Sequence, residues 1–564
     1  MSPTATERRR KHWGWGYEDG QPSREELEAA ARGIRERLGF GGESVEEPVP
    51  LHAIELPEPR VEPPASLSDL FRSDPYERIS HALGKAYRDV VRGFRGQIEH
   101  PPDLVAHPSN ESELEALLGW CAEEGIAAIS YGGGTSVVGG VEPRIGDAYR
   151  GAVSIDLGAL DRVLDVDSVS RAARIQGGAT GPRLEDQLRE HGLTLRHFPQ
   201  SFEFSTLGGW IATRAGGHFA TLYTHIDDLV ESVRAITPRG TWESRRLPGS
   251  GAGPSPDRLL LGSEGTLGII TEAWVRVQER PRFKLSAGVA FDSFEAGAEA
   301  VRELAQSGLN PSNCRLLDAT ESEVTSAGPA GKAVLVLGFE SVHHPVDEPM
   351  RVAVEAARDH GGQPGEIKSA GSNQSAGPEP RRGALRENPP VRGEAGSDPV
   401  GSWRHAFLAA PYLRDTFVAC GVLSDTFETA ITWERFADFD ARVMETARTA
   451  IAEACGVSPD GPGSPRLSRR FTHVYPDGPA PYYTVLAPAR RGGEVEQWDE
   501  IKAAVSEVVV DAGGTITHHH AVGRDHRPWY DRQRPDPFAE SLRAAKQAVD
   551  PSGILNPGVL IDPV

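Results

Sequence analysis

Residues 127–136 read Ala-Ala-Ile-Ser-Tyr-Gly-Gly-Gly-Thr-Ser, a short apolar strand that runs directly into three glycines and two hydroxyl residues. Glycine adopts positive φ without a steric penalty, so three in a row let several backbone N–H groups converge on one point. Such a turn can bind the oxygens of a phosphate group. It can equally be an ordinary turn, because it matches neither G-x-G-x-x-G nor a Walker A loop.

Two further loops of similar composition follow along the chain. Residues 199–217 read Pro-Gln-Ser-Phe-Glu-Phe-Ser-Thr-Leu-Gly-Gly-Trp-Ile-Ala-Thr-Arg-Ala-Gly-Gly, and residues 262–271 read Gly-Ser-Glu-Gly-Thr-Leu-Gly-Ile-Ile-Thr. Both put small and hydroxyl residues where a backbone has to approach a bulky polar ligand closely. Each loop alone is compatible with simple turn chemistry. The ordered set of three predicts one shared ligand site.

The segments around these loops have the pattern of an α/β region, because strand-like and helix-like stretches alternate and glycine loops join them. A Ser-x-x-Glu capping pattern at Ser23 marks the start of the first expected helix. The expected helices cover residues 23–38, 74–95, 111–124 and 537–549. The expected strands cover residues 103–106, 127–130, 153–157, 174–177, 232–237, 287–291 and 333–339.

Composition divides the chain into four parts. Residues 1–95 form an N-terminal arm with helices, and residues 96–281 hold the three loops. Residues 282–520 form a second α/β or α+β domain, and residues 521–564 form a C-terminal segment with a helix. Residues 369–402 are rich in Gly, Pro, Ser and Arg, so they cannot bury enough apolar surface to offset the entropy of ordering. We expect a mobile loop there.

Charge and cysteine content exclude several functional classes. The formal net charge of −21 disfavours binding to nucleic acid. The four cysteines have no CxxC spacing, which argues against a disulfide framework or a structural zinc site and predicts a reducing cytoplasm. The first twenty residues lack the apolar region of a secretory signal, and no apolar run is long enough to span a bilayer.

The order GGGTS, STLGGWIATRAGG, GSEGTLGIIT resembles the FAD-binding domain of the vanillyl-alcohol-oxidase, or PCMH-type, family. The resemblance implies an α+β fold with a two-subdomain FAD domain, whose first loop holds the pyrophosphate and whose other loops line the isoalloxazine and ribityl. It also implies that residues 282–520 form an α+β cap domain with an antiparallel sheet and that residues 521–564 pack back on the FAD domain. The first loop lacks the histidine that some members link to flavin, so non-covalent FAD is expected. The implied cofactor-binding residues are Ser130, Tyr131, Gly132, Gly133, Gly134, Thr135, Ser136, Gln200, Ser201, Phe202, Glu203, Phe204, Ser205, Thr206, Gly209, Thr213, Arg214, Ala215, Gly216, Glu264, Gly265, Thr266, Leu267, Gly268, Ile269 and Ile270.

Further motifs narrow the resemblance to the alkyldihydroxyacetonephosphate synthases, the flavoenzymes that form the ether bond of ether lipids. These motifs run from GWGY at 14–17 to Asn556 and include RLLD at 315–318, YLRD at 412–415 and HHHAVG at 518–523. The resemblance implies that flavin N5 traps C1 of an acyl-dihydroxyacetone phosphate as the fatty acid leaves. A fatty alcohol then attacks C1, and no net redox change occurs.

The resemblance also assigns roles to individual residues. Tyr482 is implied as the general acid/base that removes and returns a C1 proton, although a strand tyrosine more often serves packing. Free tyrosine has a pKa near ~10, so this role needs a cationic or hydrogen-bonding environment, which Arg414 and His519 could supply. Arg414 is implied to bind the substrate phosphate; from the residues alone, an ion pair with Asp415 or another neighbour is the simpler interpretation. The expected catalytic residues are Tyr482, His518, His519, His520, Arg315 and Asn556.

The histidine triplet has three interpretations. In extended backbone, His518 and His520 point to one side and His519 to the other. A solvated strand end needs no function, and a zinc site would use two of the three with a distant third ligand. No CxxC or HExxH partner is present, so no metal is expected. The resemblance instead places the triplet at the reactive face of the flavin.

The match also has departures. The strand after Tyr482 is poor in aromatic residues, Ala521 stands where the synthases have glycine, and residues 369–402 differ in composition. The rival function is an FAD-dependent 2-hydroxy-acid dehydrogenase, whose Gly-Asp-Gly-Asn-x-His metal signature corresponds to the stretch His473–Tyr482. That stretch keeps the first histidine but has a tyrosine for the second. A third alternative is a flavin-binding protein without catalysis.

The synthase interpretation predicts small lipid partners. They are an acyl-dihydroxyacetone phosphate and a fatty alcohol, with no nucleic acid. The sequence leaves open a peripheral contact with a membrane and a homodimer.

Overall fold

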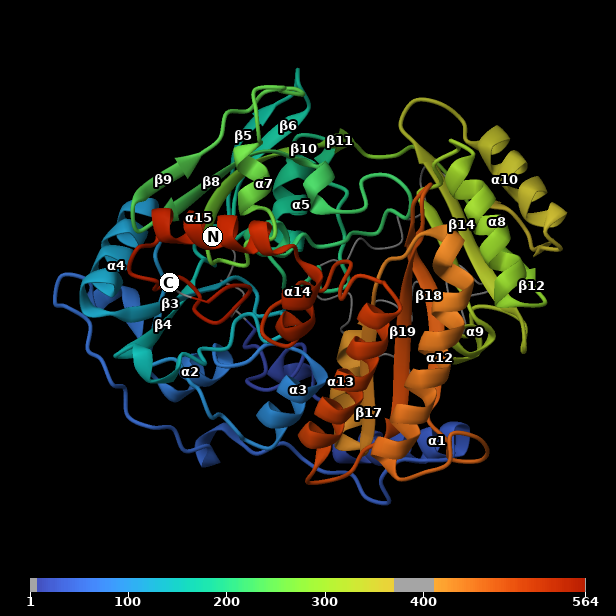
Figure 1. Ribbon diagram of the computed structural model, residues 1–564, viewed down its shortest axis with the longest axis horizontal. Coiled ribbons are helices and arrows are strands. Elements are labelled where there is room, and N and C mark those ends of the chain that lie inside the picture. Colours follow the sequence, from blue (N-terminus) through green and yellow to red (C-terminus); the bar gives the residue numbers. More distant parts are fainter. Residues whose placement is uncertain (1–7, 370–409, 563–564) are drawn as a thin grey trace, which may run out of the picture.

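The computed structural model describes residues 8–369 and 410–562 (Figure 1). The expected loop at 369–402 lies, apart from Ser369, outside the described residues. Residues 410–419, where the description resumes, are helical. The described elements confirm the α+β class, with helices, a mixed sheet and antiparallel sheets.

Two sheets build the half of the molecule that carries the three loops. The first is mixed, and its strands in spatial order are β1 (Phe71–Arg72), β2 (Leu104–Ala106), β4 (Gly151–Asp156) and β3 (Ile126–Tyr131). The second is antiparallel, in the order β5 (Val163–Asp167), β6 (Ala172–Gln176), β10 (Ile269–Arg276), β8 (Val230–Thr237) and β9 (Gly240–Glu243). The short strands β7 (Leu193–Thr194) and β11 (Gln278–Glu279) pair with each other. The helices of this half are α4 (Glu111–Glu124), α5 (Gly181–Glu190), α6 (Leu207–Thr213) and α7 (Pro256–Leu260).

The N-terminal arm contains the clearest difference from the expected elements. The single helix predicted over 74–95 is two helices, α2 (Pro75–Ser80) and α3 (Tyr87–Phe94). Between them Lys85 N donates to Ser136 O at 2.6 Å, and a side chain on Gly84 would overlap the same carbonyl. The helix breaks because its backbone packs against the first glycine loop, which periodicity along the sequence does not reveal.

The first helix of the arm begins as the sequence predicts. In α1 (Arg24–Leu38) the Ser23 side chain accepts from Glu26 N, and Ser23 N donates to the Glu26 carboxylate at 2.7 Å. This reciprocal pair satisfies two backbone donors at the helix end. The described residues also include five short 3-10 helices, η1 (Glu18–Gly20), η2 (Leu51–Ala53), η3 (Ser68–Leu70), η4 (Gly146–Ala148) and η5 (Ile226–Asp228).

One large antiparallel sheet forms the other half of the molecule. Its strands in spatial order are β15 (Gln363–Pro364), β12 (Phe283–Phe291), β14 (Ala333–Ser341), β13 (Asn313–Leu317), β18 (Arg466–Val474), β19 (Pro479–Pro488) and β17 (Val422–Glu428), with β16 (Lys368–Ser369) beside β12. Helices flank it in Figure 1: α8 (Phe294–Gln306), α9 (Ala319–Thr325), α10 (Asp347–Asp359), α12 (Trp433–Cys455) and α13 (Glu494–Asp511).

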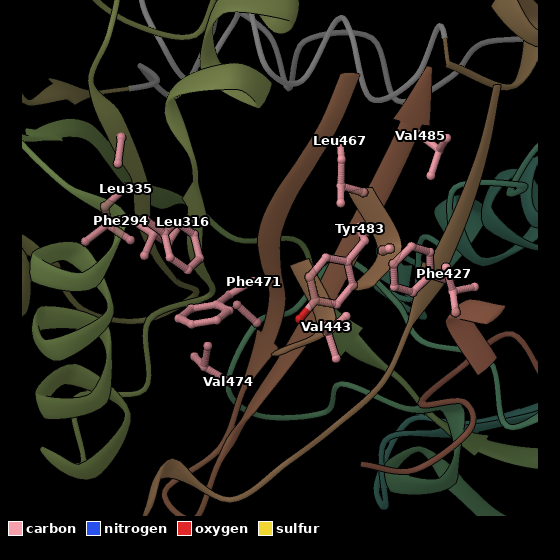
Figure 2. Packing of buried hydrophobic residues seen from close by; sticks show 14 of the residues in the cluster. Phe294, Leu316, Leu335, Phe427, Val443, Leu467, Phe471, Val474, Tyr483 and Val485 are labelled. Atoms are coloured by element: carbon pink, nitrogen blue, oxygen red, sulfur yellow. The ribbon is translucent and has the colours of Figure 1, made fainter. Parts of the chain in front are cut away.

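Strand alternation gives this sheet two different faces. In β19, Tyr483 and Val485 belong to the buried apolar cluster shown in Figure 2, while Tyr482 and Thr484 face the opposite way. Successive side chains on a strand point to opposite faces, so one face packs under α8, α10, α12 and α13 and the other stays polar. The polar face looks toward the glycine loops.

The C-terminal segment packs on the half that holds the glycine loops. It consists of α14 (Arg527–Gln533), α15 (Asp536–Val549) and a tail, with α15 crossing the half that holds the glycine loops in Figure 1. The buried Lys546 ammonium donates to Thr266 O at 2.9 Å, to Leu555 O at 2.6 Å and to Asp550 at 2.6 Å. Among the described residues, no helix has the length and apolar character needed to cross a membrane.

We expect Lys546→Met to lower the free energy of unfolding by about 3–5 kcal/mol, because it leaves the buried Asp550 carboxylate without its cation. Urea denaturation followed by tryptophan fluorescence measures the change. Lys332→Met is the matched control: it removes a lysine from an ion pair with the exposed Asp292 and should cost at most about 1 kcal/mol. Equal denaturation midpoints for the two variants would contradict the assignment.

Candidate active site

The three glycine loops meet at one end of a single large cavity of about 390 Å³. Their contacts leave no room for side chains. A methyl group on Gly133 would overlap the Phe204 carbonyl oxygen, one on Gly132 would overlap the Thr206 hydroxyl, and one on Gly265 (φ 76°) would overlap the Ser130 hydroxyl. Backbone groups and hydroxyls therefore form this wall, which is the chemistry that a pyrophosphate and a flavin ring require. The residues present fit FAD.

The C-terminal segment closes this end of the cavity. Asn556 Nδ2 donates to Glu264 O at 2.7 Å and to Gly140 O at 3.0 Å. The Glu264 carboxylate in turn accepts from Val522 N at 2.9 Å and Gly523 N at 2.8 Å. Burial raises the pKa of Glu264 to about 7, although these two donors oppose the rise. Asn556 thus lines the cavity and also positions the third loop.

The polar face of the large sheet forms the opposite wall. Alternate residues of its strands line the cavity, because they share one face of the sheet. A register shift between Phe471 and His473 lets both Thr472 and His473 reach the cavity. The lining residues from this sheet are Arg315, Ser424, Thr426, Arg470, Thr472, His473, Tyr482, Thr484 and Leu486.

Tyr482 lies at the centre of this wall. Its hydroxyl donates to Thr426 Oγ1 at 3.0 Å, and the Arg470 guanidinium sits 3.9 Å above its ring centroid. Burial raises the pKa of Tyr482, while Arg470 and the Thr426 hydrogen bond act in the opposite direction. The His519 ring stacks beside Tyr482 at 6.0 Å between centroids. The nearest cation to Tyr482 is thus Arg470, which the sequence interpretation did not name.

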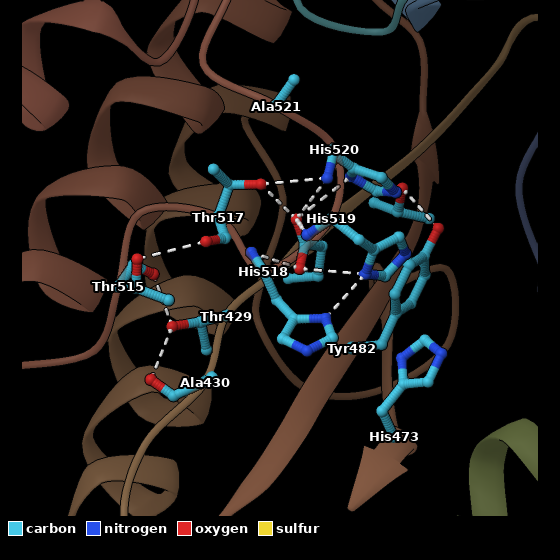
Figure 3. A network of polar contacts seen from close by, with 12 residues as sticks. Thr429, Ala430, His473, Tyr482, Thr515, Thr517, His518, His519, His520 and Ala521 are labelled. Atoms are coloured by element: carbon cyan, nitrogen blue, oxygen red, sulfur yellow. Dashed lines mark hydrogen bonds and ion pairs between the residues drawn. The ribbon is translucent and has the colours of Figure 1, made fainter. Parts of the chain in front are cut away.

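The histidine triplet is held by one buried carboxylate, that of Glu428 at the end of β17. Glu428 accepts from the backbone N–H groups of His518, His519 and His520 at 2.8, 3.2 and 3.1 Å, and from the Thr517 hydroxyl at 2.5 Å (Figure 3). Burial alone would raise the pKa of Glu428, but the neighbouring histidines and these donors hold it well below its usual range.

The expected extended backbone of the triplet is not what the structure shows. Residues 518–520 form a bend around Glu428, because three consecutive N–H groups point at one carboxylate. As a result His519 and His520 line the cavity, and His518 lies behind them. Figure 3 shows the three imidazoles fanning out from this bend, with His519 beside Tyr482.

Comparisons with known proteins agree with this geometry. A family model described as FAD binding domain matches residues 102–244, and one described as FAD linked oxidases, C-terminal domain matches residues 280–560. The alkyldihydroxyacetonephosphate synthase of Dictyostelium discoideum is 30% identical over 88% of this chain and 79% of its own length. That of Trypanosoma brucei brucei is 29% identical over 87% and 78%.

A solved structure of an alkyldihydroxyacetonephosphate synthase is 25% identical, with a TM-score of 0.75 over 97% of this chain and 98% of that chain. The chain belongs to the alkyldihydroxyacetonephosphate synthase family. FAD is its cofactor: a family model for an FAD-binding domain matches the chain, and the three loops of that domain line the cavity. The two-subdomain FAD domain with an α+β second domain is confirmed by the same matches.

Most residues that the sequence assigned to the site of this synthase-family chain do line its cavity. Arg414 does so while its guanidinium donates to Lys85 O at 2.7 Å and lies 3.6 Å from Asp425. Asp415, the neighbour considered for that ion pair, binds Lys11 at 2.9 Å instead. The predicted residues that line the cavity are Ser130, Tyr131, Gly132, Gly133, Gly134, Thr135, Ser136, Gln200, Ser201, Ser205, Thr206, Gly209, Thr213, Ala215, Gly216, Glu264, Gly265, Gly268, Ile269, Ile270, Arg315, Arg414, Tyr482, His519, His520 and Asn556.

Seven predicted residues lie outside the lining, because their side chains have partners elsewhere. Arg214 points to Asp227, with its Nε 2.7 Å from the carboxylate, and its side chain is 58% exposed. Thr266 donates to Ser263 O at 2.7 Å, and Glu203 binds the Tyr412 hydroxyl. The other residues outside the lining are Phe202, Phe204, Leu267 and His518.

The sequence interpretation missed two residues that organise the site, Glu428 and Arg470. Ser424, Thr426 and Glu428 occupy every second position of β17, and this spacing is the one signal that could have placed Glu428 on the same face of the sheet as Thr426. Arg470 carries no such signal. Its position over Tyr482 follows from the pairing of β18 with β19, where Arg470 is opposite Tyr482.

Three histidines come close enough for a metal ion to be considered. One ring nitrogen from each of His473, His518 and His519 lies within 4.8 Å of the others. His518 Nδ1 and His519 Nδ1 already share a hydrogen bond at 3.0 Å, and His473 Nε2 donates to Gly217 O at 3.0 Å. These bonds join His518 to His519 and tie His473 to the second glycine loop.

We expect Gly133→Ala to yield protein that loses its flavin on purification, because the added methyl group forces the first loop away from Phe204. The ratio of absorbance at the flavin band to that of the protein measures retention. Gly119→Ala is the control, because Gly119 lies in helix α4 and a methyl group added there has no other atom within 4 Å. Full flavin content in Gly133→Ala would show that the loop does not form the cofactor wall.

We expect Glu428→Gln to lower the free energy of unfolding at pH 7 by about 1–3 kcal/mol, because an amide leaves buried N–H donors without an acceptor. The native pKa of Glu428 lies below the unfolded value of about 4.3. The difference in free energy of unfolding between the parent and the variant is therefore complete above pH ~4.3, and it shrinks as the pH falls below that value. Urea denaturation at several pH values tests this; a difference that grows toward low pH would contradict it.

Proposed function

We propose that this protein exchanges the acyl group of an acyl-dihydroxyacetone phosphate for a fatty alcohol, which forms an ether-lipid precursor without net redox change. The observation that carries the proposal is the continuity of one cavity from the FAD loops to Tyr482, His519 and the arginines of the sheet. Relatives named alkyldihydroxyacetonephosphate synthase support it. FAD supplies an electrophilic ring at which the C1 carbon of the substrate can react.

The substrate phosphate matches the charges of the second wall. Arg315, Arg414 and Arg470 all line the cavity there, and guanidinium groups are suited to oxyanions. The Arg414 guanidinium is held in the wall by its hydrogen bond to Lys85 O at 2.7 Å and by a longer ion pair with Asp425 at 3.6 Å. We assign Arg414 to the phosphate and Arg315 to the same electropositive wall.

Tyr482 is placed to move the C1 proton. Its hydroxyl is hydrogen-bonded to Thr426 and lies on the cavity face. Burial raises the pKa of Tyr482, and the Arg470 guanidinium over its ring opposes this rise, so Arg470 lowers the cost of forming the phenolate that takes the C1 proton. Tyr482 then holds the proton on its oxygen and can return it to the same carbon.

The lipid chains require an apolar part of the cavity. Leu413, Phe417 and Leu486 line it, and Val324 lies at its edge with 51% of its surface exposed. These side chains support a substrate with an aliphatic tail. We also propose that FAD is held without a covalent bond, because the loop at 130–136 carries no histidine. Peripheral membrane contact and a homodimer stay predictions.

We expect purified protein given palmitoyl-dihydroxyacetone phosphate and hexadecanol to form the alkyl ether and release palmitate. Tyr482→Phe should lower this rate by about 10²-fold or more, because it removes the acid/base group. Tyr483→Phe is the matched control: its hydroxyl binds Asp440 at 2.9 Å on the other face of the sheet, so turnover should persist. Mass spectrometry measures ether formation. Flavin bleaching by D-lactate or D-2-hydroxyglutarate with no ether product would instead support the 2-hydroxy-acid dehydrogenase alternative.

A further inference from the structure

A chain of hydrogen-bonded ring nitrogens leads from the cavity toward the protein surface. His519 lines the cavity, and its Nδ1 lies 3.0 Å from His518 Nδ1. His518 Nε2 lies 3.1 Å from His225 Nε2 and 2.7 Å from the Tyr475 hydroxyl. His225 Nδ1 contacts Arg214 O at 2.9 Å. Three imidazoles thus connect in series across the wall.

The far end of the chain reaches solvent. His225 and Tyr475 are only half-buried, and their sequence neighbours Asp228, Pro476 and Asp477 are exposed. His225 follows the second glycine loop, whereas His518 belongs to the bend around Glu428. Only the tertiary fold brings them together, so the contact joins the two halves of the molecule.

The position of each hydrogen follows from one carbonyl group. Arg214 O can only accept, so His225 Nδ1 carries a hydrogen and its Nε2, when the ring is neutral, is an acceptor. His518 must then donate from Nε2 and accept at Nδ1. His519 in turn donates from Nδ1, which leaves its Nε2 with a free lone pair. Each neutral ring has one donor and one acceptor nitrogen, and the chain is consistent from end to end.

The proposed reaction needs such a path. The C1–O bond to the acyl group breaks, and the acyl group leaves as a carboxylate with both bonding electrons. The bond from C1 to the alcohol oxygen forms, and the alcohol O–H bond breaks. Tyr482 removes the C1 proton and later returns it, so this proton is neither gained nor lost over a turnover. When the fatty acid departs in its carboxylate form, the alcohol proton is therefore left over, and each such turnover has to deliver one proton from the cavity to solvent by a separate path.

We propose that His519, His518 and His225 form a relay that carries this proton out of the cavity. This inference rests on the proposed function. His519 Nε2 takes the alcohol proton while its Nδ1 hydrogen passes to His518, and the His518 Nε2 hydrogen passes to His225. Glu428, 3.4 Å from His519 Nδ1, stabilises the transient positive charge. His225 then gives its Nδ1 hydrogen to a solvent water that takes the place of Arg214 O, and a half-turn of each ring restores the starting tautomers before the next turnover. Tyr475 supports the middle of the chain through its hydroxyl.

The hydrogen positions can be tested without turnover. In ¹⁵N-labelled holoprotein, long-range ¹⁵N–¹H spectra distinguish the two tautomers of each neutral histidine, and single-histidine variants assign the signals. We expect Nδ1–H for His225, Nε2–H for His518 and Nδ1–H for His519. The opposite tautomer at His519 would overturn the relay, as would one equivalent of a bound transition metal in elemental analysis, since the nitrogens would then be ligands.

Kinetics test the same relay during ether formation. We expect His225→Ala to lower kcat about tenfold or more with little change in KM, because the relay loses its terminal acceptor. Added imidazole should restore the rate, since the half-exposed position leaves a space that a free base can enter. His107→Ala is the matched control, a half-buried histidine bound to Glu77 outside the relay; it should keep its rate and show no response to imidazole.

The outcomes separate the relay from the proposed function. A parent protein that makes no ether contradicts the proposed function, and the tautomer pattern still decides whether the proton path exists. An active parent whose His225→Ala variant keeps full kcat overturns the relay and leaves the proposed function standing. A loss in His225→Ala that imidazole does not restore indicates a structural role for His225, and this result also overturns the relay.

Discussion

The carboxylate of Glu428 ties the bend that carries the histidines to the sheet that carries Tyr482. It is 4% exposed and accepts hydrogen bonds from three consecutive backbone N–H groups. A buried charge is tolerated only where donors compensate it, so the bend and the strand end cannot separate cheaply. This single anchor decides which imidazoles face the cavity, and therefore where a base can stand relative to the flavin loops.

A second constraint acts at the opposite wall, where backbones approach one another too closely for side chains. A methyl group added to Gly132, Gly133 or Gly265 would overlap an atom of a neighbouring residue. The wall that results consists of backbone dipoles and hydroxyls, which are rigid because neighbouring loops hold them. A rigid, pre-organised surface suits a large cofactor, because little ordering remains to be done on binding. Lys546 and Asn556 then brace these loops from behind.

The sequence predicted the elements well where local patterns dominate. The helix at 111–124 and the strands around the first loop form because their apolar periodicity and caps agree with their tertiary environment. The helix expected over 74–95 failed because Gly84 and Lys85 pack on the first loop, a contact between distant parts of the chain. The extended triplet failed for the same reason, since Glu428 lies ninety residues away in sequence.

The amino-acid sequence by itself determined the α+β class, the three ordered loops and the identity of FAD, because these depend on short motifs and local periodicity. It also supplied the motifs that mark Tyr482, Arg414 and the histidine triplet. Only the tertiary structure decided that Arg470 lies over Tyr482 and that His518 connects His519 to His225. The register of the strands and the packing of the loops set these contacts. Burial of the apolar face of the sheet fixes that register, and this burial depends on several segments together rather than on any one of them.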